Sequence, residues 1–231
     1  RVIEENREIP AIDGVELATV GTLTIEVGEE ESLHVEAEDN LLPYINSEVR
    51  GGTLVIDTEP QTHLNNTEPI AYYLTVQELE TLALTSSGDI DAPDLEADRF
   101  SIRVSSSGDL TMGELTCESC DIRLSSSGDA HLNAVYAPRL DIRISSSGDL
   151  IINDGDVERQ EVHLSSSGNY EARDLDSESA SIEINSSGSV TIWVDEHLDA
   201  DLSSSGNLIY YGEPVIEAST SSSGDVVNAG D

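Results

Sequence analysis

Lysine is absent from this chain of 231 residues, and its ten basic residues, all arginine, stand against 47 aspartates and glutamates. The formal net charge is −37. Nucleic acids and anionic membrane surfaces are bound through clustered lysine and arginine, so neither is expected as a partner. An acidic chain without lysine is typical of adaptation to high salt, where concentrated cations screen self-repulsion. A dedicated cation-binding role is the alternative explanation of the acidity.

Aromatic residues are also scarce, at 4%, and no apolar run approaches the length of a membrane span. We therefore expect an aliphatic core and no membrane insertion. The 37% of hydrophobic residues recur periodically, which argues against disorder despite the charge. The chain begins at Arg1 rather than at a methionine, which a removed export signal or trimming would both explain.

Only two cysteines occur, Cys117 and Cys120, and they have the C-x-x-C spacing of redox motifs and zinc sites. No second pair is present to complete a zinc site, and no βα pattern surrounds this one. Both cysteines align with apolar residues of neighbouring repeats. We therefore expect two thiols buried in the core.

A five-residue phrase, Ser105-Ser106-Ser107-Gly108-Asp109 or a close variant, occurs eight times in the second part of the chain. The intervals are twenty residues five times and then eighteen residues twice. A fixed period in this range predicts a solenoid, in which each coil buries its apolar face against its neighbours. The glycines of the phrase are Gly88, Gly108, Gly128, Gly148, Gly168, Gly188, Gly206 and Gly224.

Apolar residues stand at fixed positions around each of these glycines, namely six residues before, four before and two after. When the coils are stacked, these positions become continuous aliphatic columns, which we predict to form the core. Alternation places the middle serine of the phrase inward, where the hydroxyl of the next coil can pair with it. The glycine is expected to turn the chain with a positive φ. The column four residues before the glycine contains Leu84, Val104, Leu124, Ile144, Leu164, Ile184 and Leu202.

Residues 1–80 lack the serine phrase and are expected to form less regular β coils, continuous with the regular β-helix of residues 81–231. Alternating apolar and polar residues predict strands at 15–17, 22–27, 32–37 and 53–57. A short helical turn is expected within 39–45, with Asp39 or Asn40 as its cap. Residues 59–69 are expected to be a loop.

Three segments in this order resemble the family known as the putative auto-transporter adhesin head domain, or GIN domain. They are residues 36–45, residues 51–56 and the repeated S-x-S-G-D phrases, and the resemblance covers about 12–225. It implies a right-handed parallel β-helix that is exported to the periplasm or cell surface of bacteria and has no established activity. The family usually has glycine before the Ser-Gly pair, where this chain has serine.

Two charged features follow the coils on the outside. Arginines and a histidine form one column, carboxylates stand two residues earlier, and the two columns are expected to form a solvated face. The aspartates after the repeat glycines are interpreted as turn caps, with a weak calcium or other cation ladder as the alternative and no cofactor otherwise expected. The first feature contains Arg103, Arg123, Arg143 and His163 beside Asp121, Asp141 and Glu161, and the second contains Asp89, Asp109, Asp129 and Asp149.

The column five residues after the glycine is the least repetitive one, and it contains Arg173, Trp193 and Tyr211 on successive coils. If these side chains point outward, they form an aromatic platform suited to a sugar ring or an apolar partner. A register shift in the eighteen-residue coils would instead turn the indole inward. The three residues are the candidate ligand-binding residues.

Catalysis is the competing class, because β-helix lyases and hydrolases act on polysaccharides with clustered carboxylates. The conspicuous residues of this chain recur in every coil, whereas a catalytic site is one asymmetric constellation. The five histidines are scattered without metal-ligand spacing. We therefore expect a non-catalytic adhesion or scaffolding module that binds a glycan or a surface protein. An open strand edge after the last coil, residues 221–226, suggests end-to-end association.

Overall fold

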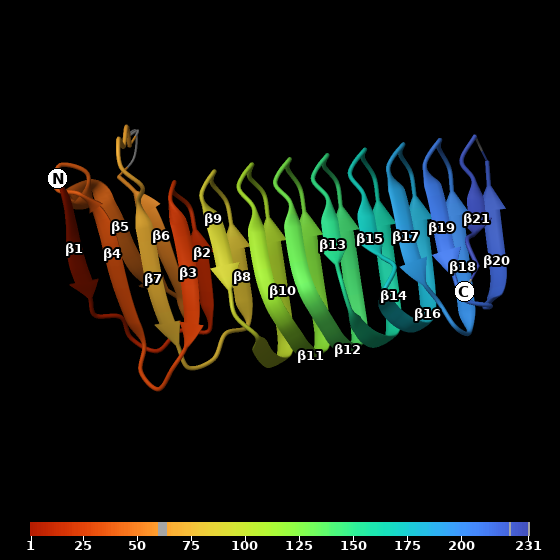
Figure 1. The fold of residues 1–231 in the computed structure, drawn as a ribbon, viewed down its shortest axis with the longest axis horizontal. Helices are drawn as coiled ribbons and strands as arrows, with labels where there is room; N and C mark the ends of the chain where they lie inside the picture. The colour runs from red at the N-terminus through yellow and green to blue at the C-terminus, as the bar shows by residue number, and fades with distance from the viewer. Residues whose placement is uncertain (60–63, 222, 231) are drawn as a thin grey trace.

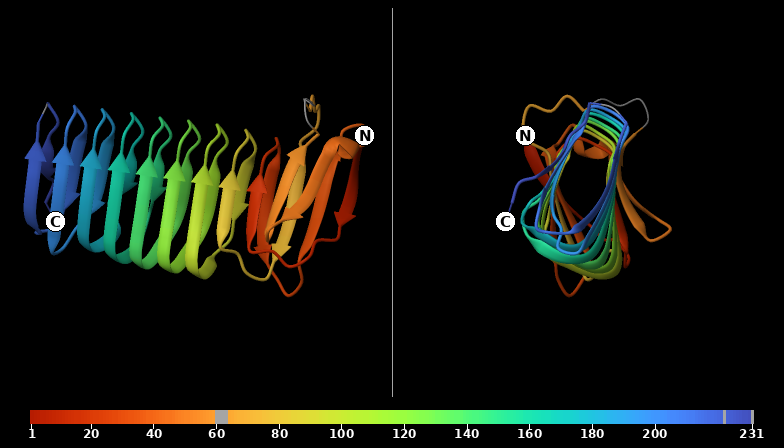
Figure 2. Two further views of the ribbon diagram at one scale, coloured as in Figure 1. Left: turned by 180° about the vertical axis from the view of Figure 1, so that it is seen from behind. Right: turned by 90° about the vertical axis from the view of Figure 1, so that its right-hand side faces the viewer.

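Parallel strands stacked coil upon coil make up most of the molecule in the computed structural model, which describes residues 1–59, 64–221 and 223–230. The chain ends lie at opposite ends of the stack (Figure 1). Seen along the long axis, the coils superimpose as a flattened tube (Figure 2). The predicted all-β parallel β-helix with coils of about twenty residues is confirmed.

In the regular part, each coil contributes one strand before the serine turn and one after it. Neighbouring coils pair in parallel with a shift of twenty residues, as in Ile102 with Ile122, or of eighteen residues in the last coils, as in Val190 with Leu208. The strands are β8 (Thr81–Leu84), β9 (Asp89–Ala92), β10 (Leu95–Val104), β11 (Leu110–Leu124), β12 (Ala130–Ile144), β13 (Leu150–Ile152), β14 (Gly155–Leu164), β15 (Tyr170–Ala172), β16 (Leu175–Ile184), β17 (Ser189–Trp193), β18 (His197–Leu202), β19 (Asn207–Tyr211), β20 (Val215–Thr220) and β21 (Val226–Asn228).

The N-terminal part departs from simple coil order. Strands β2 and β3 pair in parallel with β6 and β7 on one side and with β8 and β9 on the other, so an early coil lies between two later ones. Antiparallel pairs join β1 to β4, β4 to β7 and β5 to β6. The elements are β1 (Val2–Arg7), β2 (Gly14–Leu17), β3 (Thr22–Val27), β4 (Ser32–Glu38), η1 (Leu42–Tyr44), β5 (Ile45–Arg50), β6 (Thr53–Thr58) and β7 (Ala71–Val76).

Four of these strands coincide with those expected from alternation, whereas β1 and β5 were not expected. The helical turn is present, but Leu41 is its N-cap and no side chain caps it, so the prediction of Asp39 or Asn40 as the cap is wrong. The turn is held instead by burial of Leu42 and by the proline that follows it. Residues 60–63 of the expected loop lie outside the described residues.

The predicted core columns are buried. The column four residues before the repeat glycine is at most 1% exposed from Leu84 to Leu202. Tyr170 takes the aliphatic position two residues after its glycine and is 1% exposed. The core is therefore a continuous stack of side chains along the axis, each shielded by the equivalent residue of the next coil.

The predicted conformation of the repeat glycines is wrong. All eight lie within the described residues, and none has a positive φ. A Cβ atom at Gly128 would instead collide with the carbonyl oxygen of Gly108 in the preceding coil, and one at Gly206 would lie 2.6 Å from the oxygen of Gly188. Glycine is required because successive backbones approach each other closely at this turn.

The predicted serine-to-serine ladder is also wrong in its partners. The middle serines are half-buried, and the hydroxyls of Ser106 and Ser146 accept hydrogen bonds from the backbone N–H two residues later, each at 3.4 Å. The hydroxyl of Ser166 donates to the carbonyl of Ser146. These serine hydroxyls thus pair with backbone groups of the turns.

The expectation of two free thiols in the core requires a correction. Cys117 and Cys120 are buried, at 4% and 0% exposed, but they form a disulfide. Strand β11 bends between them, so that residues three apart both face the interior, with Cα atoms 6.1 Å apart. The alternation of a straight strand would have placed them on opposite faces.

Candidate functional site

The structure brings together the three residues of the predicted platform. Strands β17 and β19 pair in parallel with Trp193 opposite Tyr211, and the two ring planes are 3° apart with centroids separated by 6.1 Å. The Cζ atom of Arg173 lies 4.7 Å from the centre of the Tyr211 ring. Trp193 stands between the buried residues Ile192 and Val194, so its indole lies on the outer surface. We call these three residues the aromatic platform.

The eighteen-residue coils do not turn the indole inward, because their two missing residues fall after the platform. Val190 still pairs with Leu208, and Trp193 with Tyr211. The shortening is absorbed between β17 and β18, where His197 pairs with Ser179. Both platform rings therefore keep the outward alternation of their strands.

A buried polar chain supports the platform from inside. The Ser177 hydroxyl donates to the carbonyl oxygen of Trp193 at 2.5 Å and accepts from the Gln160 amide at 2.9 Å. The hydroxyl of Tyr170 donates to Gln160 at 3.2 Å, and burial raises the pKa of Tyr170. Outside, the Trp193 indole N–H donates to Asp195 at 2.8 Å. This chain was not expected from the sequence, although Gln160 and Ser177 interrupt apolar columns.

The aspartate row that follows the repeat glycines is bonded along the axis. The backbone N–H of Asp109 donates to the Asp89 carboxylate at 3.0 Å, that of Asp129 to Asp109 at 3.0 Å, and that of Asp149 to Asp129 at 2.7 Å. Asn169 continues the row by donating to Asp149 at 2.8 Å. Each carboxylate thus caps the next coil, and a cation ladder at these four aspartates stays a prediction.

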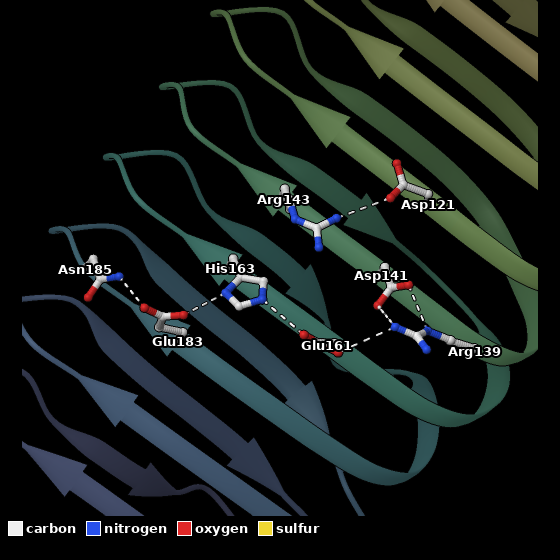
Figure 3. A network of polar contacts seen from close by, with 8 residues as sticks. All are labelled: Asp121, Arg139, Asp141, Arg143, Glu161, His163, Glu183 and Asn185. Carbon is white, nitrogen blue, oxygen red and sulfur yellow. Dashed lines mark hydrogen bonds and ion pairs between the residues drawn. The ribbon is translucent and has the colours of Figure 1, made fainter.

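The charged columns lie on the strands that precede the serine turns, and their residues form the network in Figure 3. Arg143 lies 3.3 Å from Asp121 of the preceding coil, and the His163 imidazole contacts Glu183 of the next coil at 2.8 Å. Hydrogen bonds from Asn185, at 2.6 Å, and then from His163 lower the pKa of Glu183. His163 also lies 3.2 Å from Glu161 of its own coil, so polar contacts join these columns both between coils and within a coil.

Two hollows lie away from the platform. A groove of about 590 Å³ runs along the arginine column and is lined by Arg103, Arg123 and Arg143 together with the first serines of the turns. A larger hollow of about 690 Å³ lies at the corner beside Cys117, and half of its lining residues are aspartates and glutamates. Neither hollow contains a platform residue.

Metal-ligating side chains that are far apart in the sequence meet at the N-terminal end. Glu4 of β1 and His34 and Glu36 of β4 have ligand atoms within 4.8 Å of one another. The five histidines have no metal-ligand spacing in the sequence, so this group was not expected. The one indication in the sequence was the pair His34-x-Glu36 in an expected strand, because a spacing of two residues puts both side chains on one face of the strand.

These features define a class, the parallel β-solenoids whose outer face carries repeated polar columns interrupted by an aromatic platform. Residues 12–214 match the family described as putative auto-transporter adhesin, head GIN domain, and the chain belongs to this family. Membership of this family, which the sequence resemblance predicted, is confirmed. No curated protein matches the sequence. Among the described residues, no helix is both long enough and apolar enough to span a membrane.

Solved structures share the fold at low sequence identity. A putative adhesin from Parabacteroides merdae ATCC 43184 is similar with a TM-score of 0.88 and 16% identity, over 99% of this chain and 97% of that one. A putative lipid binding protein from Parabacteroides distasonis ATCC 8503 has a TM-score of 0.86 and 23% identity, over 98% and 97%. A putative adhesin from the same organism has a TM-score of 0.83 and 17% identity, over 98% and 96%. At these identities the likeness shows the fold.

Proposed function

We propose that this protein is a non-catalytic adhesion module of the cell surface or periplasm, and that it binds a glycan through the aromatic platform. Membership of a family of adhesin heads supports a role in attachment outside the cytoplasm. The rigid stack of coils suits such a role, since it presents side chains at fixed spacing on a long surface. A surface protein is the alternative ligand.

The observation that carries the proposal is the parallel pair of Trp193 and Tyr211 with Arg173 beside it. Aromatic rings offer apolar surface to the C–H face of a sugar, and a guanidinium offers several donors to its hydroxyl or carboxyl oxygens. The bond from Trp193 to Asp195 and the buried contact of its backbone with Ser177 hold the indole in place. A pre-positioned platform loses little entropy on binding.

A polysaccharide-active enzyme is the second candidate, because the groove along the arginine column and the acidic hollow are both large enough for sugar units. The repetition of serine, aspartate and arginine from coil to coil favours binding along a surface over a single reaction centre. A turnover screen on neutral and acidic polysaccharides separates the two candidates. Cleavage of any of them would replace the adhesion proposal by an enzymatic one.

The platform is tested by a glycan array on the intact chain, followed by affinity measurements on the best glycan. Trp193→Ala should weaken binding about tenfold, because an aromatic contact contributes about 1 kcal/mol or more. The melting temperature of Trp193→Ala should differ little from that of the unaltered chain, since the indole is only half-buried. Tyr136→Ala is the matched control, because Tyr136 is an exposed aromatic residue of β12 outside the platform. Unchanged affinity in Trp193→Ala, or a large loss of stability, would overturn the platform.

A further inference from the structure

Strands β1 and β4 bring three metal-ligating side chains onto one outer face of the N-terminal sheet. Their antiparallel register places Glu4 opposite Glu36, and Asn6 opposite His34. Because side chains two residues apart share a face of a strand, all four point to the same side. This arrangement follows from the backbone pairing and is independent of side-chain rotamers.

The imidazole of His34 is oriented by a neighbour outside the ligand set. Its Nδ1 atom lies 2.8 Å from the side-chain oxygen of Asn6. An amide oxygen only accepts hydrogen bonds, so Nδ1 carries a proton, and Nε2 is the ring nitrogen left to bind a metal ion. On the other side, the ring of Tyr73 from β7 stands 5.9 Å from the imidazole. Such an outer partner is the usual means of aiming a histidine at a metal ion.

The Nε2 atom faces two carboxylates at distances that do not suit hydrogen bonds. Nε2 lies 3.5 Å from Glu36 and 3.9 Å from Glu4, whereas a charged N–H···O bond spans about 2.7 to 2.9 Å. Zinc bonds to nitrogen and oxygen of about 2.0 to 2.2 Å give a tetrahedron with ligand atoms about 3.3 to 3.6 Å apart. The contact with Glu36 matches that edge. Glu4 is 70% exposed and can close the small remaining gap by a change of rotamer.

The negative charge around the cluster also favours binding of a cation. Like charges directly opposite each other on paired strands are destabilising, and Glu4 faces Glu36 in this way. Within the described residues, His34 is the only basic side chain in ion-pair distance of either carboxylate. Arg7 of the same strand is paired with Glu5 instead. The net charge of −37 adds a field that concentrates cations at the surface.

We propose that Glu4, His34 and Glu36 form a binding site for a divalent transition metal, and that Zn²⁺ fits it best. One imidazole and two carboxylates provide three ligands, and the fourth position of the tetrahedron is open to water or an external ligand. Asn6 holds the imidazole in its ligating tautomer. The metal joins β1 to β4 and so fastens the strand at the N-terminal end of the solenoid. The site lies on other strands than the aromatic platform and does not depend on it.

The proposal is tested by titrating the metal-stripped chain with Zn²⁺ by calorimetry, in excess Mg²⁺ to occupy the exposed carboxylates. The unaltered chain should bind one Zn²⁺ tightly, and Co²⁺ in its place should give the visible absorption of tetrahedral coordination. His34→Ala should lose this binding, and Asn6→Ala should weaken it about 10- to 100-fold. His131→Ala is the matched control, because His131 lies on β12 outside the cluster and should leave binding unchanged.

Two results would overturn the site, namely the absence of stoichiometric Zn²⁺ binding by the unaltered chain and equal binding by His34→Ala. If His34→Ala fails to fold, Zn²⁺ binding by Glu4→Gln provides a second test of the site. Glu4 is exposed and its replacement leaves the strand pairing intact, so the folded variant should still bind Zn²⁺ more weakly. Full affinity in Glu4→Gln would remove Glu4 from the ligand set and with it the proposed three-ligand site.

Discussion

At the scale of single residues, three positions of the repeated phrase have a structural role. The glycine admits the carbonyl of the preceding coil, the middle serine bonds to backbone groups of the turn, and the aspartate accepts the N–H of the next coil. These contacts run between equivalent positions of adjacent coils. The phrase therefore recurs because every coil must make the same contacts with its neighbours.

The glycine requirement gives the first prediction. Gly128→Ala should lower the free energy of unfolding by about 1 to 3 kcal/mol, the usual cost of overpacking, because its Cβ would collide with the Gly108 oxygen. Urea denaturation followed by circular dichroism measures the change. Ser127→Ala, at the exposed neighbouring position, is the control and should cost less than about 0.5 kcal/mol. Equal stability of the two variants would show that the turn relaxes to accept a side chain.

At the scale of elements, the two ends of the solenoid differ. Strand β1 at the N-terminal end contains Glu4, Glu5 and Arg7, and charged side chains on an edge strand hinder edge-to-edge pairing. Among the described residues, strand β20 at the other end pairs only with β18, and all six residues of β20 are exposed. Val215 is 67% exposed and Ile216 is 39% exposed, although Ile216 continues a column that is buried at Leu198. The last described coil thus presents an apolar layer and an open edge.

We therefore predict self-association through the β20 end. Light scattering of the chain at high concentration should show dimers or longer assemblies in molar NaCl, where repulsion between the acidic bodies is screened. Ile216→Lys should return the protein to a monomer. Val27→Lys is the control, because Val27 is exposed on β3, which is paired on both sides. A monomer at every salt concentration would contradict the prediction.

At the scale of the whole molecule, charge is the dominant constraint. The aspartate row alone places carboxylates about 4.8 Å apart, where neighbours repel by about 1 kcal/mol in water and more near a protein surface. Hydrogen bonds and the arginine columns offset a part of this repulsion. A body with a net charge of −37 retains a large self-repulsion that solution cations can screen.

Thermal unfolding should therefore depend on salt. We expect the melting temperature to rise from dilute buffer to molar NaCl, as a salt-adapted surface requires. Millimolar CaCl2 at matched ionic strength is the comparison that separates screening from binding. An unchanged melting temperature in NaCl would contradict adaptation to salt, and an equal rise in millimolar calcium would favour the cation ladder at Asp89, Asp109, Asp129 and Asp149.

The sequence by itself determined the regular half of the protein. In a solenoid of constant period, residues one period apart in the chain are neighbours in space, so aligning the repeats already gives the contacts. The buried columns, the position of the turns and the grouping of Arg173, Trp193 and Tyr211 follow from this alignment. The period alone did not determine why the turn needs glycine, because that depends on how closely two backbones approach.

Only the tertiary structure decided the arrangement of the N-terminal part and of the corners. Strands β2 and β3 are inserted between later coils, and β1, β4 and β5 pair antiparallel, at sequence separations that no repeat encodes. The meeting of Glu4 with His34, and of Cys117 with Cys120, depends on that pairing and on a bend within β11. These contacts are non-local or rely on local curvature, whereas sequence periodicity reports only the alternation of straight strands at a constant spacing.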